Sequence, residues 1–212
     1  MQPSSPRHRP LKLKLPAPLV RWLAAATVAV GVAAGSCGAY WGVIQYQNNF
    51  NTVTEGKLYR SAQLTKNELG RAIQEHGIRS ILNLRGGHPG QNWYDDEVAV
   101  SDALGVAHYD YGLSAYRLVS TKQIDEILDI IRNAPKPLLV HCKSGADRAG
   151  LISALYRFEA EGANAAEADR QLSLAFGHFP YLWSRSKAMD DSFWAFVGAR
   201  RHAANNAANN AD

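Results

Sequence analysis

The stretch "PLLVHCKSGADRAG", residues 137–150, joins a strand-like apolar run to a turn that carries a cysteine and an arginine. The run from Leu138 to Val140 has no polar interruption, a pattern typical of a central strand covered on both faces. The turn contains a glycine and leads into a helix-like segment. In α/β sheets such strand-to-helix turns lie at the carboxyl ends of the strands, where ligands commonly bind. We therefore expect a functional site around Cys142.

Strand-like and helix-like segments alternate on both sides of this stretch. Two capping boxes, Thr65 to Glu68 and Ser120 to Gln123, mark the starts of helices. The patterns predict strands at 57–63, 78–85, 106–114 and 137–142, and helices at 65–77, 93–104, 120–133, 149–161, 165–176 and 186–199. This alternation predicts an α/β fold in which a largely parallel central sheet is flanked by helices.

Five residues separate Cys142 from Arg148. A loop of this length that wraps onto a helix N-terminus turns successive backbone N–H groups inward and forms a cradle for a tetrahedral oxyanion. The helix dipole and nearby positive charge favour the nucleophilic thiolate form of the cysteine. The guanidinium of Arg148 can bind two oxyanion oxygens at once, which a lysine cannot do with the same geometry. Together these features predict nucleophilic attack by Cys142 on a phosphate.

At this point the sequence resembles a known family. The motif "HCKSGADR", residues 141–148, is similar to the His-Cys-x5-Arg signature of the cysteine-dependent protein tyrosine and dual-specificity phosphatases. With "LYRSAQL", "ILNLR" and "LVHCKSGADRAG", the chain looks like the compact bacterial branch of that superfamily over about residues 56–197. The resemblance implies a protein tyrosine phosphatase-like fold and a phosphoric monoester hydrolase.

The resemblance also implies roles for individual residues. Cys142 would attack phosphorus and form a phosphocysteine intermediate, which water then hydrolyses. His141 would order the loop, although a simple packing role is equally consistent with the sequence. Neither a cofactor nor a metal is expected, because no metal-ligand spacing occurs. The oxygens of the phosphate would be bound by Arg148 and by the amides of Lys143, Ser144, Gly145, Ala146 and Asp147.

The general acid is harder to assign. Family members usually supply an aspartate from the loop that corresponds to 111–120, but "YGLSAYRLVS" contains no carboxylate. Asp110 lies 32 residues before Cys142, a typical family distance, yet it falls inside a predicted strand. Asp147 is favoured because it lies beside Arg148, as in some lipid-directed relatives. The alternative for Asp147 is a loop residue that forms a salt bridge.

Other functions are compatible with parts of this pattern. The missing loop aspartate, and Ala149 where relatives have Ser or Thr, would suit a catalytically weak phosphate-binding module. A sulfurtransferase or an arsenate reductase would also place a cysteine in an oxyanion-binding loop. For a phosphatase, the substrate would be a phosphorylated protein, a phosphoinositide or a small phosphate ester.

The N-terminal region predicts a membrane segment. Residues 22–44 contain no charge over 23 positions, close to the length that crosses a bilayer as a helix. Five basic and no acidic residues precede them, which places residues 1–21 in the cytoplasm and the rest on the non-cytoplasmic, periplasmic side. We expect a single-pass signal anchor. A cleaved signal peptide, or lipoprotein processing at Cys37, is the alternative.

The remaining chain divides into a linker at 45–55, a phosphatase domain at 56–200 and a disordered, low-complexity tail at 201–212. The formal net charge of +4 is small and is concentrated in the N-terminal segment. This distribution indicates a membrane partner and no nucleic acid. Two cysteines do not make a disulfide framework.

Overall fold

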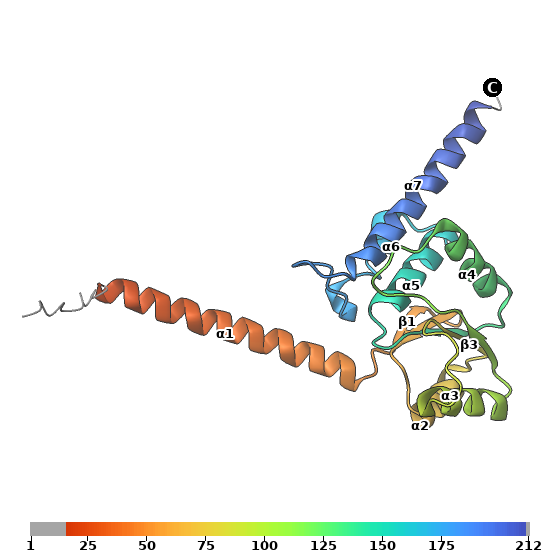
Figure 1. Cartoon of the computed structure of the whole chain (residues 1–212), viewed down its shortest axis with the longest axis horizontal. Coiled ribbons are helices and arrows are strands. Elements are labelled where there is room, and N and C mark those ends of the chain that lie inside the picture. The colour runs from red at the N-terminus through yellow and green to blue at the C-terminus, as the bar shows by residue number, and fades with distance from the viewer. Residues whose placement is uncertain (1–15, 211–212) are drawn as a thin grey trace, which may run out of the picture. The chain divides into compact units, whose positions relative to one another are not determined.

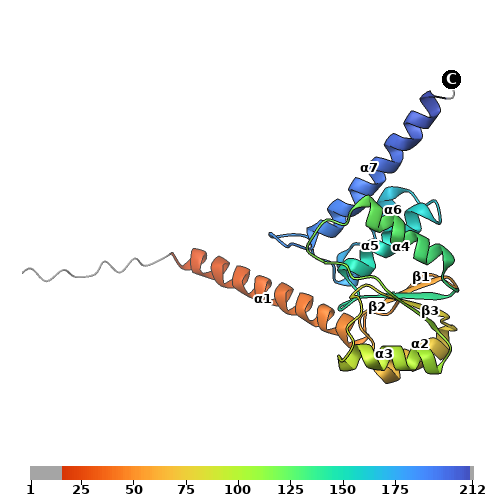
Figure 2. The same ribbon diagram turned by 45° about the vertical axis from the view of Figure 1, so that its right-hand side comes forward.

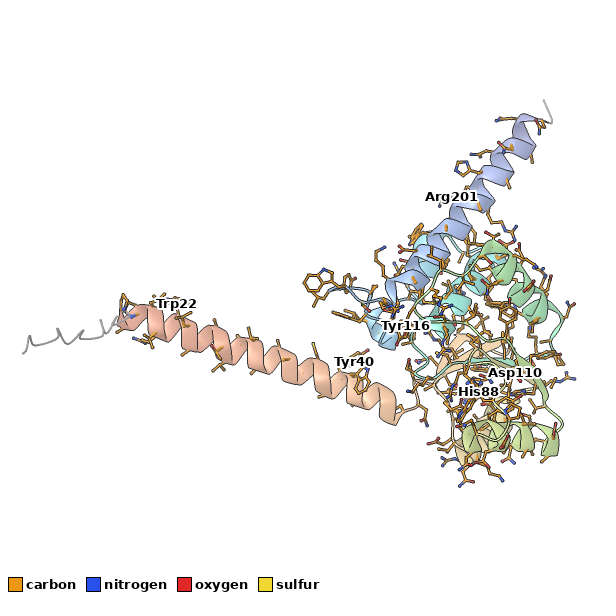
Figure 3. The ribbon with its side chains drawn as sticks, viewed as in Figure 1. Trp22, Tyr40, His88, Asp110, Tyr116 and Arg201 are labelled. Atoms are coloured by element: carbon orange, nitrogen blue, oxygen red, sulfur yellow. The ribbon has the colours of Figure 1, made fainter. Side chains whose placement is uncertain are left out.

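The computed structural model describes residues 16–210. The chain divides into two units, with the boundary between Gly42 and Val43. The first unit consists of helix α1, Ala17–Tyr46, which continues into the second (Figure 1). Its portion Ala17–Val43 is long and apolar enough for a membrane span or for a signal sequence. Trp22 and Tyr40 lie towards its two ends (Figure 3), as interfacial anchors do. Of the predicted basic N-terminal segment, residues 1–15 lie outside the described residues.

The second unit is built on a five-stranded sheet in the order β1-β2-β5-β3-β4. β1 pairs with β2 in the antiparallel sense, and the other neighbouring strands are parallel. The predicted α/β fold with a largely parallel sheet is therefore confirmed. The strands are β1 (Asn51–Thr54), β2 (Leu58–Ser61), β3 (Ser80–Asn83), β4 (Ala107–Asp110) and β5 (Leu138–His141).

Helices cover both faces of this sheet (Figures 1 and 2). One face packs against α2 (Lys66–His76) and α3 (Asn92–Ala103). The opposite face carries the larger core, formed with α4 (Thr121–Asn133), α5 (Asp147–Glu159), α6 (Ala165–Asp169) and α7 (Lys187–Asn209). A short 3-10 helix, η1 (Leu174–Phe176), precedes α7.

The local signals read from the sequence form as predicted. Both capping boxes are present, and each satisfies backbone N–H groups that have no partner at a helix start. α4 buries the one face that its periodicity predicts, which consists of Ile124, Ile127, Leu128 and Ile131. β5 is buried throughout because it lies at the centre of the sheet, between two helical layers.

The register of the parallel strands aligns their last residues at one edge. His141 pairs with Ser61 on one side and with Asn83 on the other, and Asn83 pairs with Asp110. These four positions therefore form a row at the carboxyl edge of the sheet. Cys142 follows this row directly.

The predicted strands are shorter in the structure, with 106–114 reduced to Ala107–Asp110, and three further predicted segments differ. The expected linker 45–55 contains β1, because Phe50 and Val53 pack against the two cores. The predicted helix 165–176 stops after Asp169, because the carbonyl of Gln171 accepts from Arg60 at 2.8 Å instead of continuing a helix. Residues 201–209 of the predicted disordered tail continue α7 as an exposed, alanine-rich helix.

Candidate active site

The cysteine loop, residues 142–148, connects β5 to α5. Cys142 is only 1% exposed, and its N–H donates to the Ser61 carbonyl at 3.4 Å. Gly145 has a φ of +71°, and a Cβ there would lie 2.7 Å from the backbone of Ser61 and Ala62. Only glycine can adopt this conformation so close to β2. The loop is thus pressed against the end of β2.

Arg60 holds the loop from the scaffold side. Its side chain is fully buried, and Nη2 donates to the carbonyls of Gly145 at 2.7 Å and Ala146 at 3.1 Å. Nη1 donates to Gln171, and the guanidinium lies 4.2 Å from the ring centroid of Phe176. Burial lowers the pKa of Arg60 to about 10, so the side chain remains charged at neutral pH. Arg60 therefore fixes the cysteine loop against the segment that follows α6.

Two further donors bind the next carbonyls of the loop. Asn49 is buried, and its Nδ2 donates to the Ser144 carbonyl at 3.0 Å and to the Phe176 carbonyl at 2.8 Å. The backbone N–H of Gln63 donates to the Lys143 carbonyl at 3.3 Å. The carbonyls of Lys143, Ser144, Gly145 and Ala146 therefore all point towards the scaffold.

The direction of these carbonyls determines where the loop amides point. In a trans peptide the N–H of one residue is directed opposite to the C=O of the residue before it. The N–H groups of residues 144–147 consequently face away from the scaffold, towards the open side of the loop. Within residues 16–210 none of them donates a hydrogen bond. Four adjacent free donors beside a cysteine form a site for an oxyanion.

Arg148 reaches from the first turn of α5 across the edge of the sheet. Its Nη1 donates to the carbonyls of Leu84 and Leu113, both at 3.1 Å. Its Nε is buried and has no partner within the described part of the chain. A second guanidinium, that of Arg85, lies over the ring of Trp93 at 3.3 Å. The pKa of Arg85 is lowered by burial and by the charge of Arg148. The two guanidinium groups therefore lie close enough to interact, which concentrates positive charge at the site.

His141 is bound from the α3 face of the sheet. Its Nε2 lies 3.1 Å from Oε1 of the buried Glu97, which also binds His108 at 2.8 Å. Gln63 donates to the other carboxylate oxygen at 2.6 Å. Burial alone would raise the pKa of Glu97, but these hydrogen bonds and the charge of His141 lower it to about 2. The arrangement fits a role for His141 in ordering the loop.

Asp110 is the last residue of β4 and lies at the site edge of the sheet (Figure 3). Its Oδ1 accepts from Asn83 Nδ2 at 2.7 Å, and its Oδ2 accepts from the Tyr94 hydroxyl at 2.5 Å. The pKa of Tyr94 is raised to about 12 by this hydrogen bond and by burial. Nδ1 of His108 also lies 4.0 Å from Oδ2 of Asp110.

Asp147 lies beside Arg148, but its carboxylate faces a charged partner. Its Oδ1 accepts from Nδ1 of His178 at 2.7 Å, and Nε2 of the same ring donates to Asp190 at 2.9 Å. Burial alone would lower the pKa of His178, but the two carboxylates raise it to about 9. The ring is fully buried and protonated at neutral pH, so Asp147 belongs to an ion-paired triad that joins α5 to α7.

The structure brings the predicted residues of the cysteine loop to one edge of the sheet, together with His141 and Asp110. It adds Arg60, Asn49 and Glu97, to which the sequence assigned no role. A charged residue inside the apolar strand segment "LYRSAQL" was a usable signal for Arg60, because a buried arginine needs several acceptors. Asn49 gave no such signal, because it lies in a polar segment.

The comparisons with known proteins agree with this geometry. The sequence profile of the tyrosine phosphatase family matches residues 42–163. No curated protein sequence matches the chain. Among solved structures, TpbA of P. aeruginosa is 20% identical, with 71% of this chain and 92% of that chain covered and a TM-score of 0.53.

Two other solved structures are similar in the same way. The catalytic core of SIW14 from S. cerevisiae is 20% identical, with 72% of this chain and 93% of that one covered and a TM-score of 0.53. Tk-PTP is 16% identical, with 68% and 96% covered and a TM-score of 0.51. At these identities the structures establish the fold, and the match of the family profile over more than half of the sequence establishes that the chain belongs to the tyrosine phosphatase family.

Proposed function

We propose that the chain is a membrane-anchored phosphatase that hydrolyses phosphate monoesters through a phosphocysteine intermediate on Cys142. The observation that carries this proposal is the set of loop carbonyls bound to the scaffold, which leaves the amides of residues 144–147 free around the thiol. The buried Nε of Arg148, which has no partner among residues 16–210, supports it, because a phosphate oxygen would satisfy that donor.

In the first step, the thiolate of Cys142 forms a bond to phosphorus while the bond from phosphorus to the ester oxygen breaks. The loop amides and Arg148 bind the equatorial oxygens, whose charge they stabilise in the transition state. The leaving oxygen takes a proton from a carboxylic acid. In the second step, water attacks phosphorus and gives a proton to the carboxylate left by the first step, while the P–S bond breaks; this releases phosphate and regenerates the thiolate.

For the proton donor we favour Asp110 over Asp147. The carboxylate of Asp147 is held by the buried His178 at 2.7 Å, within the triad that joins α5 to α7. The carboxylate of Asp110 lies at the carboxyl edge of the sheet, where it accepts from Asn83 and Tyr94 and lies 4.0 Å from Nδ1 of His108. Asp147 would then position the loop and would not donate the proton.

The proposed substrates are phosphorylated proteins, phosphoinositides and small phosphate esters. One similar structure is TpbA in complex with pTyr, and another, SIW14, is called a PP-IP phosphatase. In this chain, the exposed Lys143 of the loop and the half-buried Arg85 add positive charge at the site, which favours strongly anionic esters.

The decisive experiment compares Cys142→Ser with Cys37→Ser in the full chain. Phosphate release from an aryl phosphate should be lost in the first variant and unchanged in the second, because Cys37 lies on α1. Calorimetric binding of inorganic phosphate should persist in both, because the amides and Arg148 remain. Phosphate release by Cys142→Ser would overturn the mechanism. Binding without hydrolysis by the unmodified chain would identify a phosphate-binding module instead.

A further inference from the structure

Large apolar side chains are exposed on two loops next to the candidate active site. Trp183 is 97% exposed and Leu182 is 76% exposed, and both lie in the loop before α7. This loop projects from the body of the domain in Figures 1 and 2. We call the exposed group the aromatic patch; it consists of Phe179, Tyr181, Leu182, Trp183, Tyr116 and Leu118.

The backbone of the loop holds these side chains outward. Leu182 and Trp183 have φ values of 52° and 63°, a left-handed conformation that is unfavourable for residues with a Cβ. Two hydrogen bonds close the loop. The Ser186 hydroxyl donates to the Phe179 carbonyl at 3.1 Å, and the Ser184 N–H donates to the Tyr181 carbonyl at 3.1 Å. An ordered loop that exposes a Leu-Trp pair in a strained conformation is a sign of function at that position.

The two loops of the patch are joined to each other and to the cysteine loop. The guanidinium of Arg185 lies 5.5 Å from the ring centroid of Tyr116, which Figure 3 labels. Arg148 donates to Leu113 in one loop, and Asp147 accepts from His178 in the other. A pocket of about 290 Å³ is lined by residues 112–114 and 117–119 and by Gln123, so it borders both the partner of Arg148 and the patch.

The charge around the patch has one sign. Residues 112–119 and 174–187 contain no Asp or Glu, whereas they contain Arg117, Arg185 and Lys187. Lys187 is paired with Asp191, whereas neither arginine forms an ion pair within the described residues 16–210. Aromatic and leucine side chains beside arginine are the combination that enters the interface of a bilayer with anionic headgroups.

We propose that the aromatic patch inserts into the interfacial layer of a lipid bilayer. Only Gln47 and Asn48 separate the end of α1 at Tyr46 from the buried Asn49. The three Cα–Cα steps from Tyr46 to Asn49 span about 11 Å at most, so a membrane-spanning α1 keeps the domain beside the lipid surface. Insertion would place the pocket and the cysteine loop at headgroup level, where the phosphate group of a membrane-bound substrate lies.

Spin labels on the full chain test this placement. In a Cys37→Ser, Cys142→Ser background, Trp183→Cys and Leu182→Cys carry the label in the patch, and Lys122→Cys carries it on α4, where the lysine side chain is 87% exposed. The chains are reconstituted into phosphatidylcholine vesicles with a minor fraction of phosphatidylglycerol. Collisions of each label with oxygen, which concentrates in lipid, and with a water-soluble nickel complex report its depth.

The expected result is a preference for oxygen at positions 182 and 183 and for nickel at 122, with at least a several-fold difference in the collision ratio. Water-like values at 182 and 183 would overturn the proposal, as would failure of the chain to sediment with the vesicles. Dipolar broadening of the label spectra without a preference for oxygen would also overturn the proposal. It would mean that labels on two copies of the chain lie close together and that a second copy covers the patch. Since none of these readouts needs catalysis, the result is independent of the proposed phosphatase activity.

Discussion

Asp110 and Asp147 show how surroundings decide what a carboxylate can do. Both lie at the carboxyl edge of the sheet, and the sequence favoured Asp147 because it adjoins Arg148. In the structure, Asp147 is hydrogen-bonded at 2.7 Å to a buried histidine, whereas Asp110 accepts from an amide and a phenol and has His108 at 4.0 Å. The carboxylate of Asp147 is thus held in a contact that joins α5 to α7. We therefore favour Asp110 as the acid.

Substitution of each aspartate should separate the two roles. Asp110→Asn should slow hydrolysis of alkyl phosphates by about 10²- to 10⁴-fold and leave activated aryl phosphates nearly unchanged, because only a poor leaving group needs the proton. Asp147→Asn should reduce both rates by a similar factor, because it disturbs the loop. Steady-state rates on paired substrates measure both effects. A selective loss in Asp147→Asn would reverse the assignment.

At the scale of elements, the segment between α1 and β1 forms part of the active-site support. Asn48 and Asn49 have φ values of 54° and 46°, in the left-handed region that asparagine tolerates better than most residues. This turn brings Asn49 under the cysteine loop, where it binds Ser144 and Phe176. The segment predicted as a linker therefore helps to hold the amides in place.

Asn49→Ala should weaken both the fold and catalysis. Loss of two buried hydrogen bonds costs about 1–3 kcal/mol and frees the Ser144 carbonyl, so kcat/KM should fall about 10-fold or more. Asn67→Ala, on the exposed surface of α2, is the matched control and should change neither quantity. Rates and thermal unfolding of the two variants can be compared directly. Unaltered kinetics in Asn49→Ala would contradict a positioning role.

The His178 triad joins the cysteine loop to α7 and makes stability depend on pH. The pKa of His178 is about 9 in the folded chain, against 6.5 as its ordinary value. Its contribution is fully present below about pH 6.5 and is lost as the pH rises through about 9. Allowing for the partial exposure of both carboxylates, we expect a loss on the order of 2–3 kcal/mol in the free energy of unfolding.

Urea unfolding at about pH 6 and at about pH 9.5 measures this loss. His178→Gln keeps a side chain that can donate one hydrogen bond but removes the titration, so its stability should change less between the two conditions. The same pH dependence in His178→Gln as in the unmodified chain would show that another group is responsible.

At the scale of the whole molecule, the chain combines an apolar helix with an enzyme domain of the tyrosine phosphatase family. By length and composition, α1 suits a membrane span or a signal sequence equally. The apolar run continues past Cys37 to Ile44, longer than the 7 to 15 residues usual for the core of a signal peptide. This length is the reason to expect an uncleaved anchor.

The topology that we expect rests on the basic residues that precede the uncharged run 22–44. We expect the mature protein to retain residues 1–21, and a reporter fused after Asp212 to behave as non-cytoplasmic. N-terminal sequencing and the activity of the reporter check the two parts separately. An N-terminus at a lipid-modified Cys37 would establish lipoprotein processing instead.

The sequence by itself determined the alternation of strands and helices, the central apolar strand and the Cys142 to Arg148 loop. These features are local: a capping box, a helical period or a five-residue spacing is specified by residues close together in the chain. The alignment of α4 with its predicted buried face shows how much such patterns determine.

Only the tertiary structure decided which groups surround that loop. Arg60 lies 85 residues from Gly145, and Asn49 lies 95 from Ser144, so no local pattern connects them. The pairing of Asp147 with His178 across 31 residues likewise follows from no local pattern. A buried carbonyl or charge requires a partner, but the chain supplies that partner from whichever segment the packing brings near, and packing is a property of the whole fold.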